Sequence, residues 1–319
     1  MKDDMKETQE ITLKARAKIN LGLDITGRRE DGYHELRMVM QTIGLADDVT
    51  VRKTAEPGIR LVLPGEARYL PAEQEKNLAW RAAKLLADEF GDAADMRGML
   101  SDETEATIGG CGMEIELVKH IPVAAGLAGG STDAAAVLRG VNALFGLGLT
   151  QEELMARGLK LGADVPYCIL GGTALAEGVG ERLTPLEPAP DGYVLLAKPS
   201  FGVSTVWAYN RYDELAAERE AAHPDIDGIR AAIAAGDRTR MCALMGNVLE
   251  PVAESEHPQI GEIRSCMKAH GAVGAMMSGS GPSVFGIFAD EKDARSCMGE
   301  FHGICRELYL TGFFHGRNT

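Results

Sequence analysis

The stretch IPVAAGLAGGSTDAAAVLRGV, from Ile121 to Val141, places three glycines directly before a long amphipathic segment. Glycine costs backbone entropy in regular structure, so the cluster of Gly126, Gly129 and Gly130 indicates that something approaches the backbone closely. The preceding residues Met113–Val118, MEIELV, alternate as a strand does, and the following apolar residues recur at helical spacing. The sequence therefore predicts a strand, a glycine loop and a helix, in that order.

The start of the predicted helix is a candidate anion site. Its first amides lack partners within the helix, and the helix dipole is positive there, so a phosphate can bind against bare backbone. Ser131, Thr132 and Asp133 are candidate N-cap residues, and the two hydroxyls could instead contact phosphate oxygens or ligate Mg²⁺. The alternative is a tight strand-to-helix connection in which the glycines only avoid steric clashes and bind nothing. Three glycines followed by two hydroxyls favour phosphate.

Two common phosphate loops do not match this spacing. The P-loop needs a lysine directly after its last glycine, and a Rossmann loop needs G-x-G-x-x-G; neither pattern is present in this stretch. What remains, P-x-x-x-G-L-x-G-G-S-[ST], resembles the phosphate loop of the GHMP kinases, the superfamily of galactokinase, homoserine kinase and mevalonate kinase. Ala128 stands where many members have glycine, and its methyl group is tolerated if φ is negative there.

The resemblance extends through nearly the whole chain. Besides the loop, it rests on AKINLGLDITGRREDGYHEL at 17–36, LGADVPYCILGGTALAEGVGERL at 161–183 and SGSGPSVFGIF at 278–288. These motifs, in this order, are similar to the branch of the GHMP kinases that acts on 4-diphosphocytidyl-2-C-methyl-D-erythritol. The resemblance implies ATP-dependent phosphorylation of the 2-hydroxyl of that compound, a step of non-mevalonate isoprenoid precursor biosynthesis.

The resemblance also implies the fold, an α+β architecture with two domains. Residues 1–185 are expected to form an ATP-binding domain like ribosomal protein S5 domain 2, carrying the catalytic lysine and aspartate. Residues 186–319 are expected to form a ferredoxin-like domain that contributes to the substrate cleft. The boundary rests on TPLEPAPDG at 184–192, which is the stretch most typical of a linker.

Residues Ala17–Ile25, AKINLGLDI, are predicted to form a strand, because their apolar residues alternate with the others. Side chains two apart lie on the same face of a strand, so Lys18 and Asn20 are predicted to be neighbours.

Further along the chain, Thr150 begins a T-x-x-E capping box that predicts a helix start. Asp164 then follows the end of that helix. Because Pro166 biases Val165 toward extended backbone, the chain is predicted to pass from this helix directly into a strand.

Phosphoryl transfer needs a group that takes the proton of the hydroxyl and a cation that offsets the charge of the moving phosphoryl group. By resemblance, Asp164 is the base. Lys18 is expected to keep that carboxylate ionised and to steady the γ-phosphate. From the residues alone, a solvated strand lysine and a helix-terminal aspartate would be the better interpretation.

The resemblance assigns the ligand-binding residues as two sets. The nucleotide-binding set is Asn77, Pro122, Val123, Ala124, Ala125, Gly126, Leu127, Ala128, Gly129, Gly130, Ser131 and Thr132. The cytidyl substrate set is Asn20, Tyr33, His34, Met40 and Tyr209. His34 can hydrogen-bond a cytosine edge, the two tyrosines offer flat faces, and the thioether of Met40 can contact a base. Ordinary packing is the alternative for Tyr33, Met40 and Tyr209. Mg²⁺ is expected because kinases use it to offset triphosphate charge, but the sequence does not name its ligands.

Composition narrows the class of protein. The net charge of −14 argues against non-specific nucleic-acid binding, which needs a basic surface. The first ten residues, MKDDMKETQE, contain no apolar core and no long apolar run follows, so a cytoplasmic protein without a membrane anchor is predicted, as a monomer or a homodimer. The six cysteines lack metal-site spacing and are interpreted as buried reduced thiols. The polar stretch 96–112 has no assigned role.

Two alternatives stay open. The first is another GHMP-type small-molecule kinase, of the homoserine or mevalonate type, from which D-G-Y-H at 31–34 separates this chain. The second is a nucleotide-binding regulatory protein that kept the fold and lost the chemistry. The presence of both Lys18 and Asp164 argues against the second alternative.

Overall fold

The computed structural model describes residues 9–64, 73–90, 112–218 and 222–316. Its contacts divide the chain into two compact units, each built from separate segments of sequence. The first unit combines Met1–Ala15, Ala46–His120 and Gly130–Ile169, and the second combines Arg16–Leu45, Ile121–Gly129 and Leu170–Thr319. The sequence domains 1–185 and 186–319 therefore stay a prediction.

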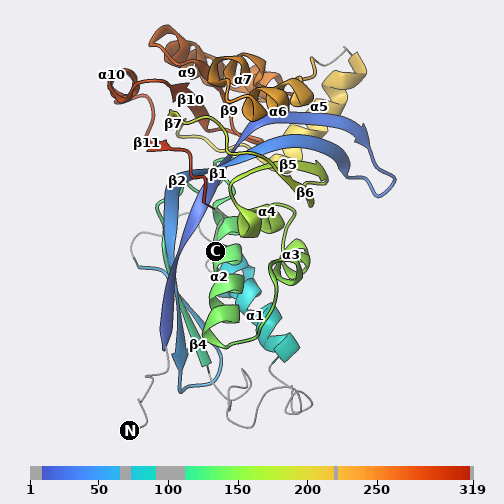
Figure 1. Cartoon of the computed structure of the whole chain (residues 1–319), viewed down its shortest axis with the longest axis vertical. Helices are drawn as coiled ribbons and strands as arrows, with labels where there is room; N and C mark the ends of the chain where they lie inside the picture. Colours follow the sequence, from blue (N-terminus) through green and yellow to red (C-terminus); the bar gives the residue numbers. More distant parts are fainter. Residues whose placement is uncertain (1–8, 65–72, 91–111, 219–221, 317–319) are drawn as a thin grey trace. The chain divides into compact units, whose positions relative to one another are not determined.

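The first unit packs helices on one side of a sheet (Figure 1). Its elements are parts of β1 (Glu10–Arg28) and β2 (His34–Thr54), with β3 (Ile59–Val62), β4 (Gly112–Val118), η1 (Gln74–Lys76), α1 (Leu78–Phe90), α2 (Gly129–Leu144), α3 (Gln151–Leu159) and α4 (Val165–Leu170). The strand order is β3-β4-β2-β1, with β2 and β4 antiparallel. A Cβ on Gly140 of α2 would lie 3.0 Å from Leu13 and 3.1 Å from Val51, so this helix packs tightly against β1 and β2.

The predicted helix after the glycine loop is present, but its predicted caps are wrong. Because α2 already begins at Gly129, Ser131, Thr132 and Asp133 lie inside the helix rather than before it. The residue that precedes the helix is Ala128, whose φ is +58°. The condition of a negative φ at Ala128 is therefore not met, and the alanine adopts the left-handed backbone that favours glycine.

The predicted helix start at Thr150 is confirmed, with both hydrogen bonds of its capping box formed. The predicted strand after Asp164 is wrong, because Val165–Leu170 is helix α4. Proline is tolerated in the first helical turn, where its missing N–H has no partner to lose. The amide of Cys168 donates to the carbonyl oxygen of Asp164 at 3.0 Å, which makes Asp164 the residue that leads into α4.

The second unit contains two sets of strands. The remaining part of β1 pairs with β8 (Gly246–Asn247). The remaining part of β2 pairs with β5 (Thr173–Gly178), and β5 also pairs with β6 (Arg182–Pro185). The separate sheet has the order β11-β7-β10-β9, all antiparallel, from β7 (Tyr193–Lys198), β9 (Gly274–Met277), β10 (Val284–Phe288) and β11 (Glu307–Gly312). Taken in chain order this is the 4-1-3-2 arrangement of a ferredoxin-like sheet, as predicted.

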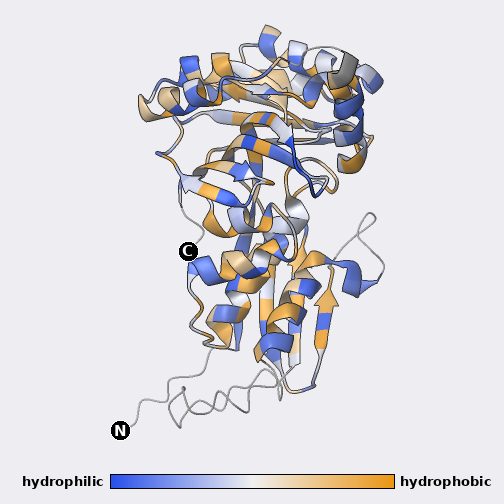
Figure 2. Cartoon of the chain, turned by 90° about the vertical axis from the view of Figure 1, so that its right-hand side faces the viewer, coloured by the Kyte–Doolittle hydropathy of each residue, from blue (hydrophilic) through white to orange (hydrophobic). Residues whose placement is uncertain are grey.

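The second unit also contains helices (Figure 1). They are α5 (Thr205–Glu218), α6 (Ile226–Ala234), α7 (Arg238–Leu244), α8 (Glu250–Glu256), α9 (Gln259–Ala269) and α10 (Glu291–Glu300). A Cβ on Gly274 would lie 2.9 Å from Cys242 of α7, and one on Gly286 would lie 3.0 Å from Met267 of α9. Gly274 pairs with Ile287, whose neighbour Gly286 points to the other side, so α7 and α9 lie on opposite faces of the sheet. Apolar residues therefore line both faces of the strands (Figure 2).

Several composition-based predictions can be compared with the structure. The described cysteines Cys168, Cys242, Cys266, Cys297 and Cys305 are free, and all but Cys266 are buried. Burial raises the pKa of Cys242 to about 12, which is typical of an inert thiol. Cys111 and all but the last residue of the 96–112 stretch lie outside the described residues. No helix among the described residues has the length and apolar character to cross a membrane.

Candidate active site

Lys18 and Asn20 are buried neighbours on β1, as their spacing predicted. The Lys18 Nζ donates to the Asn20 Oδ1 at 2.8 Å, and the Asn20 Nδ2 donates to the Met38 Sδ at 3.4 Å. Lys18 is 5% exposed and Asn20 is fully buried. An ammonium in so little solvent needs polar partners, and the amide oxygen of Asn20 supplies one. Sequence reasoning missed Met38 and chose Met40, which shares its face by alternation and is fully buried.

The glycine loop contacts the same strand. The backbone N–H of Lys18 donates to the carbonyl oxygen of Leu127 at 3.2 Å. Gly126 has a φ of +73°, and a Cβ there would lie 2.1 Å from the carbonyl oxygen of Ser278. The hydroxyl of Ser278 also donates to the carbonyl oxygen of Gly126 at 3.0 Å. Gly126 is therefore glycine for two reasons, its left-handed backbone and the close approach of another segment.

The turn between β9 and β10 completes the surroundings of the Lys18 ammonium. A Cβ on Gly279 would lie 3.5 Å from the Lys18 Nζ and 3.0 Å from the carbonyl oxygen of Gly126. Asn247 holds this turn, because its Nδ2 donates to the carbonyl oxygens of Met277 at 2.9 Å and Gly279 at 2.8 Å. Strand, loop and turn thus meet at one cation. Asn247 lies in a two-residue strand without any motif, so no pattern in the sequence indicated its role.

The junction of loop and helix fits a phosphate group. Ala124 and Ala128 have φ values of +52° and +58°, so the loop turns sharply before α2 begins. Ala128 occupies the N-cap position, and an alanine side chain cannot accept a hydrogen bond from the first-turn amides. Phosphate oxygens bind well to such amides. Of the two hydroxyl residues in this first turn, Ser131 is partly exposed and Thr132 is 1% exposed.

A buried ionic cluster in the first unit anchors the beginning of α2. The Nζ of Lys119 lies 2.7 Å from the Asp133 Oδ2 and is also paired with Asp47, which is fully buried. Burial raises the pKa of Asp133 to about 8. Burial lowers the pKa of Lys119, but the two carboxylates outweigh that effect and raise it overall. Sequence reasoning treated Asp133 only as a cap and did not assign Lys119 to the site.

Two further predicted residues belong to the first unit. Asn77 precedes α1, and its Oδ1 accepts a hydrogen bond from the amide of Ala79 at 2.9 Å. This contact gives Asn77 a structural task at the start of that helix. Asp164, the predicted base, is partly exposed at the start of α4. Because Lys18 belongs to the second unit, the joint action of Lys18 and Asp164 is part of the proposal below.

Three of the predicted substrate-binding residues, Tyr33, His34 and Tyr209, belong to the second unit, and we call them the aromatic patch. The rings of His34 and Tyr209 have centroids 5.0 Å apart and are tilted by 30°. Tyr33, next to His34 in the chain, is 65% exposed, so packing in the core does not explain this residue. Sequence reasoning missed Asp213. Its Oδ1 accepts a hydrogen bond from the His34 Nε2 at 2.7 Å.

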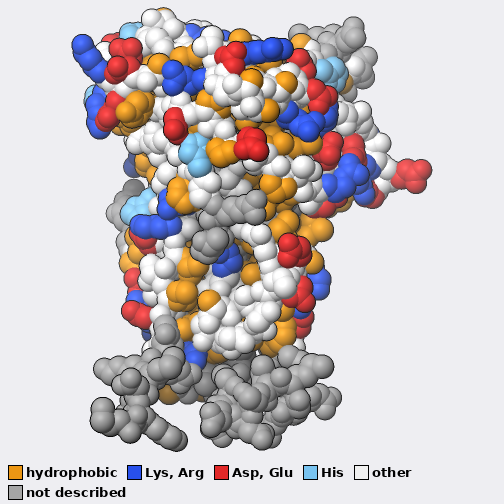
Figure 3. Space-filling view, viewed as in Figure 1, with side chains coloured by type: hydrophobic (Ala, Val, Ile, Leu, Met, Phe, Trp, Pro, Cys, Tyr) orange, Lys and Arg blue, Asp and Glu red, His pale blue; other side chains and the backbone are white. Residues whose placement is uncertain are grey.

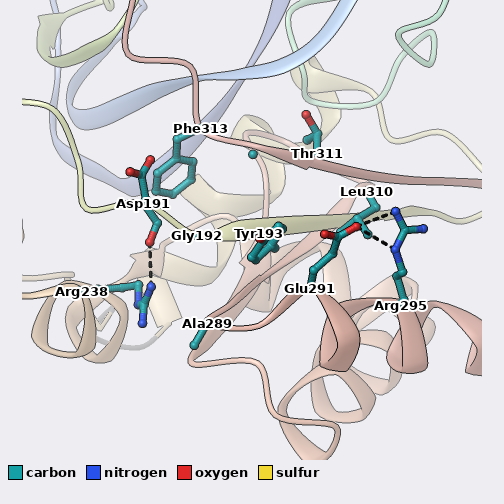
Figure 4. A pocket seen from close by; sticks show the side chains of 11 residues that line it. Asp191, Gly192, Tyr193, Arg238, Ala289, Glu291, Arg295, Leu310, Thr311 and Phe313 are labelled. Carbon is teal, nitrogen blue, oxygen red and sulfur yellow. Dashed lines mark hydrogen bonds and ion pairs between the residues drawn. The ribbon is translucent and has the colours of Figure 1, made fainter.

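A separate hollow of about 520 Å³ lies between the start of β7, the end of β11 and α10 (Figure 4). Its polar side chains pair within the protein: Arg238 donates to the carbonyl oxygen of Asp191 at 2.8 Å, and Arg295 pairs with Glu291 at 2.6 Å. The described residues that line it include none of the predicted site residues. We therefore place the candidate site at Lys18 and the loop.

One face of the molecule shows mixed charge rather than one basic field (Figure 3). On the face seen in Figure 3, Lys and Arg side chains lie among Asp and Glu side chains. Within the described part of the chain, no group of three or more His, Cys, Asp or Glu residues is arranged to hold a metal ion.

Comparison with known proteins agrees with this geometry. The family model for the GHMP kinases N terminal domain matches residues 77–172, and that for the GHMP kinases C terminal matches residues 229–302. Proteins named 4-diphosphocytidyl-2-C-methyl-D-erythritol kinase are 45% identical in Lachnoclostridium phytofermentans and 46% identical in Lachnospira eligens. These alignments cover 97% and 96% of this chain, and 99% of each relative.

Solved structures extend the likeness to three dimensions. A crystal structure of 4-(cytidine 5'-diphospho)-2C-methyl-D-erythritol kinase has a TM-score of 0.74 at 33% identity, covering 96% of this chain and 100% of the other. Homoserine kinase from Cytophaga hutchinsonii has a TM-score of 0.73 at 20% identity, covering 100% of this chain and 98% of the other, and shares the fold alone. The chain belongs to the GHMP kinases and, within them, to the family of 4-diphosphocytidyl-2-C-methyl-D-erythritol kinases.

Proposed function

We propose that this ATP-dependent small-molecule kinase transfers the γ-phosphoryl group of ATP to the 2-hydroxyl of 4-diphosphocytidyl-2-C-methyl-D-erythritol. The product belongs to the non-mevalonate route to isoprenoid precursors. The observation that carries the proposal is the buried Lys18, whose backbone N–H donates to the glycine loop and whose ammonium lies beside the Gly279 turn. The printed names of the relatives supply the substrate.

The glycine loop is the proposed phosphate cradle. Amides at the start of α2 bind oxygens of the triphosphate, and the Lys18 ammonium offsets charge on the γ-phosphoryl group. Asp164 accepts the proton of the substrate hydroxyl as its oxygen attacks phosphorus. The bond from the γ-phosphorus to the bridging oxygen then breaks, and ADP leaves with that electron pair. Mg²⁺, when bound, offsets triphosphate charge, and Ser131 or Thr132 could supply a hydroxyl ligand.

The aromatic patch is the proposed cytosine site. Tyr33 and Tyr209 offer flat faces to the base, and His34 hydrogen-bonds its edge. The exposure of Tyr33 and the tilted contact of His34 with Tyr209 support this assignment over core packing. Asn20, beside Lys18, is assigned to the part of the substrate that carries the reacting alcohol. Met40 has weaker support, because its side chain is fully buried.

Release of ADP in a coupled assay tests the proposal directly. The purified chain is given ATP, Mg²⁺ and, in separate reactions, 4-diphosphocytidyl-2-C-methyl-D-erythritol, homoserine or mevalonate. We expect turnover with the cytidyl compound and background rates with the two others. Turnover with homoserine or mevalonate alone would mean that the compound used, and not the cytidyl compound, is the substrate. ATP binding without turnover on any alcohol would favour a regulatory protein.

The remaining predictions concern partners and location. We propose that the chain works without nucleic acid, as a monomer or a homodimer in the cytoplasm. The net charge of −14 and the mixed charges on the face in Figure 3 support the absence of nucleic-acid binding. Light scattering on a size-exclusion column measures the oligomeric state.

A further inference from the structure

The histidine of the aromatic patch is held by a carboxylate on α5. His34 lies at the start of β2, and its Nε2 is 2.7 Å from the Oδ1 of Asp213. The same helix brings Tyr209 and Tyr212 against the ring, with centroids 5.0 Å and 6.5 Å away. Residues 209, 212 and 213 share one face of a helix because they are three and four positions apart. One helix therefore fixes both the place and the orientation of the imidazole.

Asp213 also fixes which ring nitrogen carries hydrogen. A carboxylate oxygen only accepts hydrogen bonds, so the Nε2 of His34 must donate to it. In a neutral imidazole the other nitrogen then has no hydrogen and acts as an acceptor. Among the described residues, the His34 ring makes its polar contact through Nε2, to Asp213. The Nδ1 lone pair is thus available to a ligand.

Arg28 fixes the carboxylate in turn. Its Nη1 lies 3.2 Å from the Oδ2 of Asp213, while the Oδ1 faces His34. The Asp213 side chain is 28% exposed and that of His34 is 11% exposed, so the contact to the ring is largely shielded from water. Each oxygen of the carboxylate consequently has its own donor, and neither donor needs to leave for the other.

We propose that Asp213 is a positioning residue that sets base selectivity by holding His34 as an acceptor at Nδ1. Cytosine carries an amino donor at the position where uracil carries a carbonyl acceptor. An acceptor on the protein pairs with the amino group and faces the carbonyl with lone pair against lone pair, which disfavours uracil. The inference rests on the proposed function, because it requires the cytidyl group to bind at the aromatic patch.

The variant Asp213→Asn tests this directly. Asparagine has one oxygen, and both Arg28 and the His34 Nε2–H require an acceptor. When the oxygen turns to Arg28, the amide NH₂ faces His34 and the ring hydrogen moves to Nδ1, which then donates. We expect the ratio of kcat/KM for the cytidyl substrate to that for its uridyl analogue to fall at least tenfold. The change should lie in the KM for the nucleotide-linked alcohol, with the KM for ATP unchanged.

Two matched variants separate positioning from damage. Arg28→Met removes the second donor and leaves the carboxylate to His34, so it should retain the selectivity of the unchanged protein. In Arg28→Met with Asp213→Asn, the asparagine oxygen is released to face His34, and part of the selectivity should return. A loss that came only from local unfolding would not be reversed by a second substitution.

A measurement on the unchanged protein covers the case in which the variants fold poorly. Nitrogen-15 chemical shifts of the neutral His34 ring should show hydrogen on Nε2 and none on Nδ1. Hydrogen on Nδ1, or unchanged selectivity in a folded Asp213→Asn protein that still uses the cytidyl substrate, would overturn the inference alone. An unchanged protein that phosphorylates neither compound would overturn the proposed function and, with it, this inference.

Discussion

The glycine loop and the helix it enters are held by two anchors of opposite character. In the second unit, Gly126 is fixed by neutral backbone contact with Ser278, so close that a single methyl group would not fit. In the first unit, Asp133 is fixed by the Lys119 ammonium, which also pairs with Asp47. The contact of Gly126 with Ser278, the neutral anchor, requires glycine at one position, so the sequence indicates it. The cluster of Lys119 with Asp47 and Asp133, the charged anchor, depends on partners far apart in the chain, so the sequence does not indicate it.

The comparison predicts that neither anchor is as important to turnover as the proposed catalytic residues Lys18 and Asp164. Lys18→Met and Asp164→Asn should each lower kcat by about a thousandfold or more, because each removes charge or proton transfer at the reacting atoms. The Kd for ADP, measured by calorimetry, should remain measurable in both. Near-normal kcat in either variant would show that the substituted residue does not have the catalytic role proposed for it.

Breaking the neutral anchor should affect both activity and stability. Gly126→Ala places a Cβ 2.1 Å from the Ser278 carbonyl oxygen at a φ of +73°. We expect a loss of about 2–4 kcal/mol in the free energy of unfolding, from strain and overpacking. The displaced loop should lower kcat/KM for ATP by about a hundredfold. Urea unfolding and the coupled assay measure the two effects.

Gly130→Ala is the matched control for this variant. Gly130 lies in the first turn of α2, and a Cβ there would be 3.5 Å from Leu78, which is ordinary contact. It should therefore fold with nearly unchanged stability, and the two variants are compared by urea unfolding. Equal losses in the two variants would mean that the helix start tolerates no side chain at all, and the special position of Gly126 would disappear.

Breaking the charged anchor should mainly affect stability. Lys119→Met leaves the buried carboxylates of Asp47 and Asp133 without their cation, which costs about 3–5 kcal/mol. Lys14→Met removes a comparable pair with Asp48 that is largely exposed, where the expected cost is about 0–1 kcal/mol. Urea unfolding of the two proteins provides the comparison. Similar small losses would show that the Lys119 cluster is no anchor.

The sequence predicted the site best where one residue type has one structural use. Gly126 and the alternating Lys18 and Asn20 belong to this class, because backbone freedom and strand period act locally. Asn247 and Asp213 could not be predicted, since each acts on a segment more than 25 positions away in the chain. The ferredoxin-like sheet followed from family motifs rather than from local pattern.

The errors have local causes as well. Val165 was assigned to a strand because proline disfavours helix before it, yet the first helical turn accepts proline at its second position. Ser131, Thr132 and Asp133 were assigned as caps because their side chains suit that role. The helix instead starts at Gly129, after an alanine with a φ of +58° whose side chain cannot cap it.

The smallest expected effect is a pH dependence that belongs to the charged anchor alone. Burial raises the pKa of Asp133 in the folded protein to about 8, from 3.8. Between these values the folded protein holds a proton that the unfolded chain has lost. The free energy of unfolding should therefore fall as pH rises through this window, by at most about 1.4 kcal/mol per pH unit.

Asp133→Asn removes this titration while Lys119 keeps its pair with Asp47. Urea unfolding at pH 5.5 and pH 7.5, chosen inside the window, should give a smaller difference for the variant than for the unchanged protein. Gly126→Ala, at the neutral anchor, should lower stability equally at both pH values. If Asp133→Asn keeps the full pH difference, the carboxyl of Asp133 is ionised in the folded state, and the anchor is an ordinary ion pair rather than a proton-holding one.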